Sequence, residues 1–224
     1  MRPVNRGPRP TDDTKNQPKV FGSYGDARED LINRLGRYCC YCNTRLTHAP
    51  EIDHVKPKSL HRHLETDWIN LLLCCKSCNT SKGTQEIDHL FRPDRDNTGR
   101  ILSVDHGALV PHPSLGDDER KEVSALLTVF NLNGIPRSIG DSRLDDLNKA
   151  QVTAQRHRRS FNDGKLDVSD ICNIATHTGF WLAWYQEFAN HPDVLDALNH
   201  AFPGTALECF APDGTTVARP NGRC

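Results

Sequence analysis

Two pairs of cysteines have the spacing that places two thiolates on one metal ion. Cys39 and Cys42 form one C-x-x-C pair, and Cys75 and Cys78 form the second. Each pair makes a tight turn, and four thiolates at about 2.3 Å from one ion complete a closed tetrahedron with no position left for substrate. The sequence therefore predicts a structural zinc site rather than four buried free thiols.

The total of nine cysteines supports this interpretation. An odd count does not suit a fully paired secreted framework, and clustering of this kind in a cytoplasmic chain is typical of metal binding. Cys40 and Cys74 could replace a ligand only by breaking the two-residue spacer, so we expect them to pack in the interior. The 32 residues at 43–74 separate the pairs, more than the roughly 15–20 of a compact zinc ribbon. The zinc is thus expected to clamp both ends of a long insertion.

The insertion, together with Asn79 just after the second cysteine pair, carries side chains that suit phosphodiester hydrolysis. A histidine, with a pKa near 6.5, is the residue best matched to deprotonating water at neutral pH, so His54 is the candidate general base. Asp53 offers a carboxylate oxygen and Asn79 an amide oxygen, both hard ligands for Mg²⁺ or Mn²⁺. Asn79 could instead be a helix N-cap, and Asn70 could simply begin a strand.

Cations near these residues are candidates for contacts with substrate phosphate. Lys82 lies one helical turn after Asn79, and Lys56 and Lys58 follow His54 closely. Release of counterions rewards cations beside a cleaved strand. A second basic run is Arg156, Arg158 and Arg159, which we interpret as a solvated helix face, with contact to a nucleic-acid backbone as the alternative.

The set Asp53-His54, Asn70 and Asn79, framed by two C-x-x-C pairs, resembles the ββα-metal core of HNH endonucleases over about residues 37–90. The resemblance implies that His54 activates water, that Asp53 and Asn79 hold the catalytic metal, and that Asn70 braces the loop carrying His54. The last position of the motif is often histidine. Asparagine at that position favours Mg²⁺ or Mn²⁺ over Ni²⁺ or Zn²⁺ in the catalytic site.

The longer sequence segment EIDHVKPKS…DWINLLLCCKSCNTSKG is similar to the HNH nucleases of Septu and retron-type antiphage systems, which act beside an ATPase. This implies an effector nuclease that acts on DNA, or on RNA such as tRNA. Because no G-x-x-x-x-G-K-[ST] element occurs in the chain, a partner must supply any ATPase. Two alternatives stay open: a standalone restriction-like HNH endonuclease, and a zinc-braced nucleic-acid-binding module that never cuts.

The sequence patterns around these residues, together with the resemblance, predict an α+β fold that is mainly helical. It has a zinc-braced ββα-metal HNH core and a helical C-terminal region. Residues 52–55 and 70–73 predict two short strands, and residues 78–82 open a helix. We expect a disordered basic arm at 1–19, the nuclease module with its zinc site at 20–92, a connector with a hairpin near 97–99 at 93–116, and a helical region for docking a partner at 117–224. Within that last region, apolar spacing predicts helices at 117–132, 141–160, 168–190 and 192–201.

Composition limits the remaining possibilities. The net charge is −1, so any attraction to phosphate must come from local patches. The mean hydropathy is −0.63, and no run of about 18 apolar residues occurs, which argues against a membrane span. The first residues are basic without an apolar stretch behind them, unlike a secretory signal. We therefore expect a cytoplasmic protein.

Overall fold

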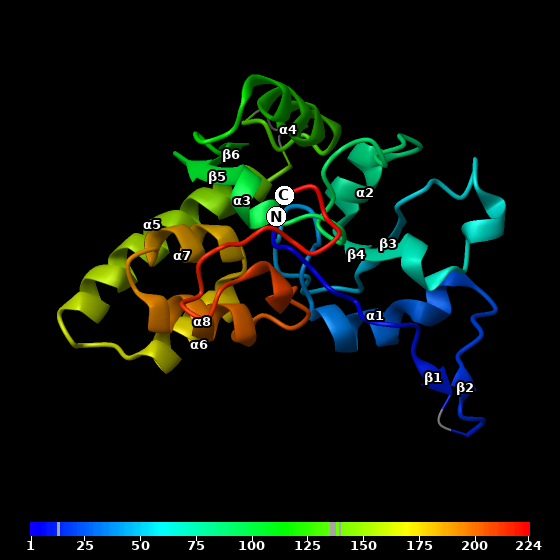
Figure 1. Cartoon of the computed structure of the whole chain (residues 1–224), viewed down its shortest axis with the longest axis horizontal. Coiled ribbons are helices and arrows are strands. Elements are labelled where there is room, and N and C mark those ends of the chain that lie inside the picture. The colour runs from blue at the N-terminus through cyan, green and yellow to red at the C-terminus, as the bar shows by residue number, and fades with distance from the viewer. Residues whose placement is uncertain (13, 135–137, 139) are drawn as a thin grey trace.

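The computed structural model describes residues 1–12, 14–134, 138 and 140–224 (Figure 1). The positions between these ranges belong to the expected arm and helical region and lie outside the described residues. The strands are β1 (Thr11–Asp12), β2 (Gln17–Pro18), β3 (Glu51–His54), β4 (Leu71–Cys74), β5 (Leu102–Asp105) and β6 (Ala108–Pro111). The α-helices are α1 (Arg28–Leu35), α2 (Lys76–Lys82), α3 (Thr98–Ile101), α4 (Asp117–Val129), α5 (Arg143–Asn162), α6 (Val168–Thr178), α7 (Trp181–Glu187) and α8 (Pro192–Ala201). Short 3-10 helices are η1 (Tyr24–Ala27), η2 (Arg62–Leu64), η3 (Trp68–Asn70) and η4 (Leu207–Cys209). The mainly helical α+β class predicted from the sequence is confirmed.

A two-stranded hairpin followed by a short helix forms the predicted ββα unit. β3 pairs antiparallel with β4, which sets Ile52 opposite Leu73 and His54 opposite Leu71. All four residues of β4 are buried, as expected for an uninterrupted apolar run. α2 packs against β3 and ends at Gly83, whose φ of 53° is in the region that favours glycine. This unit lies on one side of the molecule, and α5–α8 lie on the other (Figure 1).

Residues 1–10 pack against the rest of the protein, which corrects the expectation of a disordered arm for this part of 1–19, whereas β1 and β2 after them are largely exposed. Arg2 and Val4 are each 1% exposed. The Arg2 guanidinium donates to the carbonyl oxygens of Phe202 at 2.8 Å and Leu35 at 3.2 Å. These bonds compensate for removing its charge from water. The partners lie far away in the sequence, so local composition could not reveal them.

The connector holds a hairpin, but not at the predicted position. Asn97 caps α3 instead of forming a turn, because its side chain accepts a hydrogen bond from the backbone N–H of Gly99 at 3.1 Å. The hairpin is β5–β6. Its turn contains His106 and Gly107, with φ of 45° and 76°, and both positive values are typical of a tight two-residue turn.

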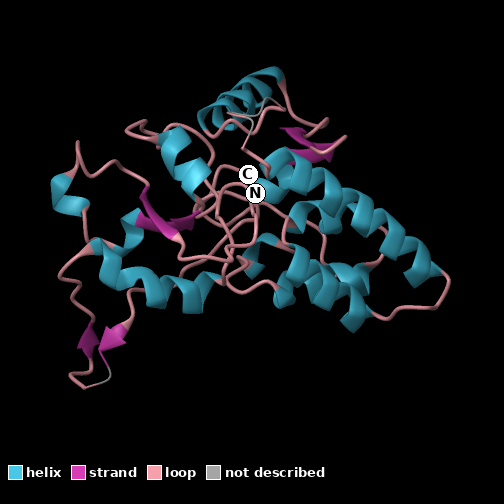
Figure 2. Cartoon of the chain, turned by 180° about the vertical axis from the view of Figure 1, so that it is seen from behind, coloured by secondary structure: helices cyan, strands magenta, loops and turns pink. Residues whose placement is uncertain are grey.

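The helical region consists of α4–α8 among the described residues (Figure 2). The helix expected at 168–190 is two helices, α6 and α7, because the chain adopts positive φ at Gly179 (80°) and Phe180 (55°). The break turns Trp181 and Trp184 into the interior, where both are fully buried. α5 packs on α7, and α6 packs on α8. None of the described helices combines the length and the apolar character that crossing a membrane requires.

Candidate active site and zinc centre

The four predicted zinc ligands converge. The Sγ atoms of Cys39, Cys42, Cys75 and Cys78 all lie within 4.8 Å of one another, and those of Cys42 and Cys75 are 3.8 Å apart. A tetrahedron with metal–sulfur distances of about 2.3 Å has edges of about 3.8 Å. The cluster therefore fits a zinc ion. Cys40 and Cys74, expected to be packing residues, are also buried.

Two N–H donors contact the sulfur atoms of the cluster, one from within the second pair and one from outside both pairs. The backbone N–H of Cys78 points at the Cys75 sulfur at 3.3 Å. The guanidinium of Arg143, at the start of α5, donates to the Cys78 sulfur at 3.0 Å and to the carbonyl of Phe130 at 2.9 Å. Asp141 holds the other side of that guanidinium at 2.7 Å. Such donors offset the charge of metal-bound thiolates, and Arg143 attaches the helical region to the zinc centre.

One cavity collects the predicted catalytic side chains. Its volume is about 330 Å³, and Asp53, His54 and Asn79 all line it. β3 supplies the first two residues and α2 supplies the third. Tyr24, from η1, closes one side with its ring 4.9 Å from that of His54. The ββα unit thus aims a base and two oxygen ligands into one opening.

The His54 ring is held in one tautomer. Its Nε2 lies 2.9 Å from the backbone carbonyl oxygen of Glu65. A carbonyl oxygen can only accept, so Nε2 carries the proton and Nδ1 keeps a free lone pair. Burial of the ring lowers the pKa of His54 below its usual value, although the Glu65 carbonyl and Asp53 oppose the shift. His54 is therefore a neutral imidazole at pH 7, the state that a general base requires.

Asp53 is anchored at both oxygens. Tyr41 donates its hydroxyl to Oδ2, and the Lys82 ammonium lies 3.1 Å from Oδ1. The same ammonium donates to the backbone carbonyl of His54 at 2.7 Å. The Lys82 side chain is only 1% exposed, so it is not placed to contact substrate phosphate. This is a correction of the sequence-based expectation: Lys82 positions Asp53 and the strand that carries His54.

The two asparagines hold different parts of the site. Asn79 donates its amide N–H to the Glu51 carboxylate at 2.6 Å, which leaves the Asn79 amide oxygen for another partner. The buried Asn70 accepts from the backbone N–H of Lys56 at 2.8 Å and donates to the carbonyls of Lys56 and Leu64 at 3.0 and 3.1 Å. Asn70 thereby ties together the loop after β3, as a bracing role requires.

The remaining two lysines lie in different places: Lys58 is exposed on the wall of the cavity, and the half-buried Lys56 lines a separate depression. The Lys58 ammonium is 4.3 Å from the centre of the Tyr24 ring and 3.4 Å from the Glu65 carboxylate, and Lys58 lines the cavity. Lys56 makes a 3.6 Å ion pair with Asp88. Exposed pairs of this kind are weak, so both cations can exchange their partner for a phosphate.

Sequence reasoning missed several positioning residues, namely Tyr41, Glu51, Glu65 and Arg143. Glu51 had a readable signal, because side chains two positions apart in a strand share a face and Glu51 is two before Asp53. Tyr41 lies inside the first C-x-x-C pair, where only its bond to Asp53 shows its role. Arg143 is 65 positions from Cys78, and no local pattern connects them.

A ββα hairpin with four clustered cysteines, and with a histidine, an aspartate and an asparagine in one cavity, is the arrangement that the resemblance to HNH endonucleases predicts. Residues 39–85 match the family model described as HNH endonuclease, so the chain carries an HNH endonuclease domain at these residues. The chain is also similar to the Septu protein PtuB of Bacillus thuringiensis, with 37% identity over 59 residues. The match covers 25% of this chain, and the chain spans only 23% of the length of that relative.

Proposed function

We propose that the protein is a metal-dependent HNH endonuclease that hydrolyses phosphodiester bonds as the effector of an antiphage defence complex. The observation that supports this most directly is the joint placement of Asp53, His54 and Asn79 around one cavity. The same side chains in a binding module that never cuts would have no reason to converge. The similarity to a Septu protein supports the defence setting.

In this proposal His54 is the general base. Its Nδ1 takes a proton from a water molecule, the water oxygen forms a bond to phosphorus, and the bond from phosphorus to the leaving oxygen breaks. The leaving oxygen then takes a proton from solvent. Burial of the imidazole keeps it neutral and the Glu65 carbonyl fixes its direction, so the base is ready before substrate arrives.

Asp53 and Asn79 would hold a catalytic Mg²⁺ or Mn²⁺. Two protein ligands suffice for Mg²⁺, which keeps several waters, and each carboxylate oxygen of Asp53 retains a second lone pair beside its present donor. When bound, the ion neutralises charge on the phosphate and on the leaving oxygen. Tyr41 and Lys82 fix the carboxylate, and Glu51 fixes the amide. Asn70 keeps the loop after β3 in place.

The partner in this proposal is an ATPase from the same defence system, and the helical region at 117–224 is its docking surface. DNA is the substrate that we favour, with RNA such as tRNA as the alternative. Cleavage assays on both nucleic acids, with and without a copurified ATPase, decide between these substrates. If no ATPase copurifies and the chain alone cuts DNA at a defined site, the protein is instead a standalone restriction-like HNH endonuclease.

The decisive experiment is plasmid and tRNA cleavage by the full chain with Mg²⁺ or Mn²⁺. We expect cleavage by the parent protein, none with a chelator, and a loss of at least about 10²-fold for His54→Ala, the size typical of a removed general base. Lys149→Met, at an exposed position on α5, is the matched control. Equal rates for parent and His54→Ala would refute the assignment of the base.

A further inference from the structure

Two shallow depressions lie on the zinc knuckle, outside the catalytic cavity. One, of about 340 Å³, is lined by residues of the segment 44–51 together with Cys74, Cys75 and Lys76. The other, of about 280 Å³, is lined by Arg37, Tyr38 and residues of α6 and α8 among others. Arg45 lines both. The two depressions therefore meet at this side chain.

The depressions carry cations without partners. Arg37, Arg45 and Lys76 are exposed, and among the described residues none of them forms an ion pair with a carboxylate. Among the described residues that line the two depressions, Glu51 is the only acid, and its carboxylate accepts a hydrogen bond from the Asn79 amide. In a chain of net charge −1, these three neighbouring cations outnumber the single acid Glu51 and form a local positive patch.

This basic groove, defined by Arg37, Arg45 and Lys76, adjoins the catalytic cavity. Glu51 lies on the wall of the groove, and its hydrogen-bond partner Asn79, at 2.6 Å, lies on the wall of the cavity. A polymer whose scissile phosphate sits at His54 can therefore continue past Asn79 onto the groove.

The backbone that carries Arg45 is held firmly. Tyr38 and Arg45 form one β-bridge, and Thr44 and Gly179 form another. Asn43 accepts the backbone N–H of Phe180 at 2.9 Å. Because a side chain at Gly179 would come within 3.1 Å of the Arg45 backbone nitrogen, the two segments are in close contact. A fixed backbone reduces the entropy lost when Arg45 meets a ligand.

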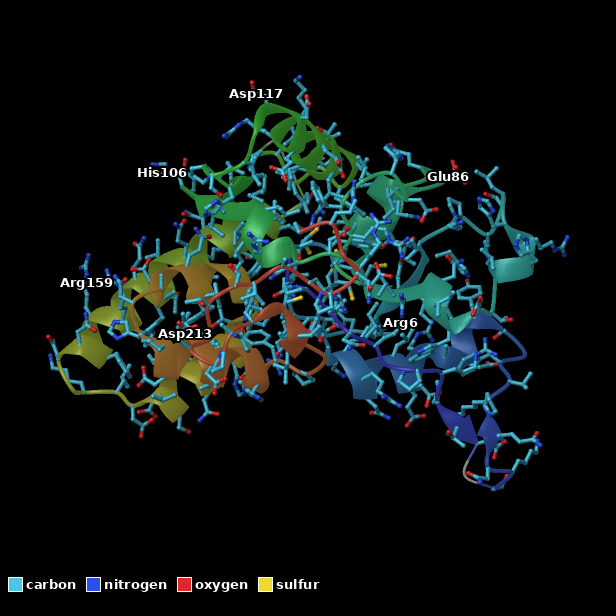
Figure 3. All side chains as sticks on the ribbon, in the orientation of Figure 1. Arg6, Glu86, His106, Asp117, Arg159 and Asp213 are labelled. Atoms are coloured by element: carbon cyan, nitrogen blue, oxygen red, sulfur yellow. The ribbon has the colours of Figure 1, made fainter. Side chains whose placement is uncertain are left out.

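We propose that the basic groove binds the sugar–phosphate backbone of the substrate nucleic acid, several nucleotides away from the cleaved bond. The inference rests on the proposed nuclease function and adds a surface that the catalytic residues do not include. Unpaired cations beside a polyanion gain from release of the counterions that the polyanion holds. The exposed run on α5, at Arg156 and Arg159, is the competing surface. In Figure 3, Arg159 lies on the opposite side of the molecule from Glu86, which follows α2.

The test measures binding without cleavage. Full-length protein with His54→Ala is titrated into fluorescein-labelled duplex DNA, single-stranded DNA or RNA, and anisotropy gives the affinity between about 50 and 200 mM salt. We compare Arg37→Gln/Arg45→Gln with the charge-matched pair Arg156→Gln/Arg159→Gln in the same background. Zinc content by release with a thiol reagent, and the melting temperature, confirm that each variant is folded.

Two lost phosphate contacts reduce the slope of log affinity against log salt by about 1.8 for duplex and about 1.4 for a single strand. For duplex, the ratio of parent to variant affinity then shrinks about 12-fold between 50 and 200 mM salt. The control pair should keep the parent slope, and the nucleic acid with the largest difference is the one that the groove takes. Adding Lys76→Gln to the groove variant should make the dependence of log affinity on log salt weaker still.

A groove variant with the parent slope, or an equal reduction in the control pair, overturns the proposal. If the active chain cleaves while the groove variant keeps the parent slope, the groove fails and the nuclease function stands. If the His54→Ala protein binds none of the three nucleic acids and the protein with intact His54 cleaves none of them, the nuclease function itself fails.

Discussion

Lys82 and Asp53 form a buried ion pair whose loss should be visible in the stability of the protein. Their side chains are 1% and 4% exposed, with Nζ and Oδ1 3.1 Å apart. Lys82→Met keeps the length of the side chain but leaves the carboxylate without its cation. Removing one partner of a buried pair costs roughly 3–5 kcal/mol. For a chain of this size that corresponds to a drop in melting temperature of roughly 6–20 °C.

A double-mutant cycle separates the pair from its surroundings. Asp53→Asn alone strands the ammonium and should also destabilise the protein. Lys82→Met/Asp53→Asn removes both charges, so its loss should be smaller than the sum of the two single losses by about 0.5–3 kcal/mol. Urea unfolding of the zinc-loaded protein gives the four free energies. The exposed pair Lys149–Asp146 is the control, and Lys149→Met should change the free energy of unfolding by less than about 0.5 kcal/mol.

A metal ion offers a second readout of the same pair. Asp53 without Lys82 has an uncompensated negative charge facing the cavity, so added Mg²⁺ should stabilise Lys82→Met more than it stabilises the parent. Additive losses in the cycle, or a Lys82→Met variant as stable as the parent, would show that the ammonium is not the buried partner of Asp53.

Three further predictions follow from the site. Because burial lowers the pKa of His54 below its usual value of 6.5, the base is deprotonated at neutral pH. The cleavage rate should therefore rise with pH on the acid side with a midpoint below about pH 6.5, and a midpoint at or above that value contradicts the buried base. Asn70→Ala leaves backbone groups of the loop after β3 without their hydrogen-bond partner, so the free energy of unfolding in urea should fall by about 1–3 kcal/mol. The kcat should fall by up to about 10²-fold because His54 is misplaced. An unchanged kcat argues against the bracing role of Asn70. Removing zinc with a strong chelator should lower the melting temperature and abolish nucleic-acid binding, and a chelated protein that melts like the parent would exclude a structural ion.

The ligands of the zinc centre and the members of the catalytic cavity were accessible from sequence because each depends on short-range geometry. A two-residue spacer brings Cys39 and Cys42 to one ion whatever surrounds them. Strand pairing then places His54 opposite Leu71, and α2, which begins inside the second cysteine pair, brings Asn79 alongside. Once the four cysteines converge, the chain around them has little freedom, and the positions of these residues are largely fixed.

The errors concern burial, which is a property of the whole fold. A lysine one turn after Asn79 could be exposed or buried, and the sequence around Lys82 does not distinguish the two. Its burial depends on Asp53 and on the carbonyl of His54. The sequence around Arg2 likewise predicts a polar arm, because its partner, the carbonyl of Phe202, lies far away in the chain. Long-range partners of this kind leave no periodic signal.

The contact of Arg143 with the Cys78 sulfur, and of Asn43 with the start of α7, make the helical half a working part of the zinc knuckle. A fragment that stops after the family-matched stretch would lose a donor to a metal ligand and bare the Tyr41 ring, which stacks on Phe130 at 4.0 Å. Grafting this HNH domain onto another carrier therefore means transplanting α4, α5 and α7 as well.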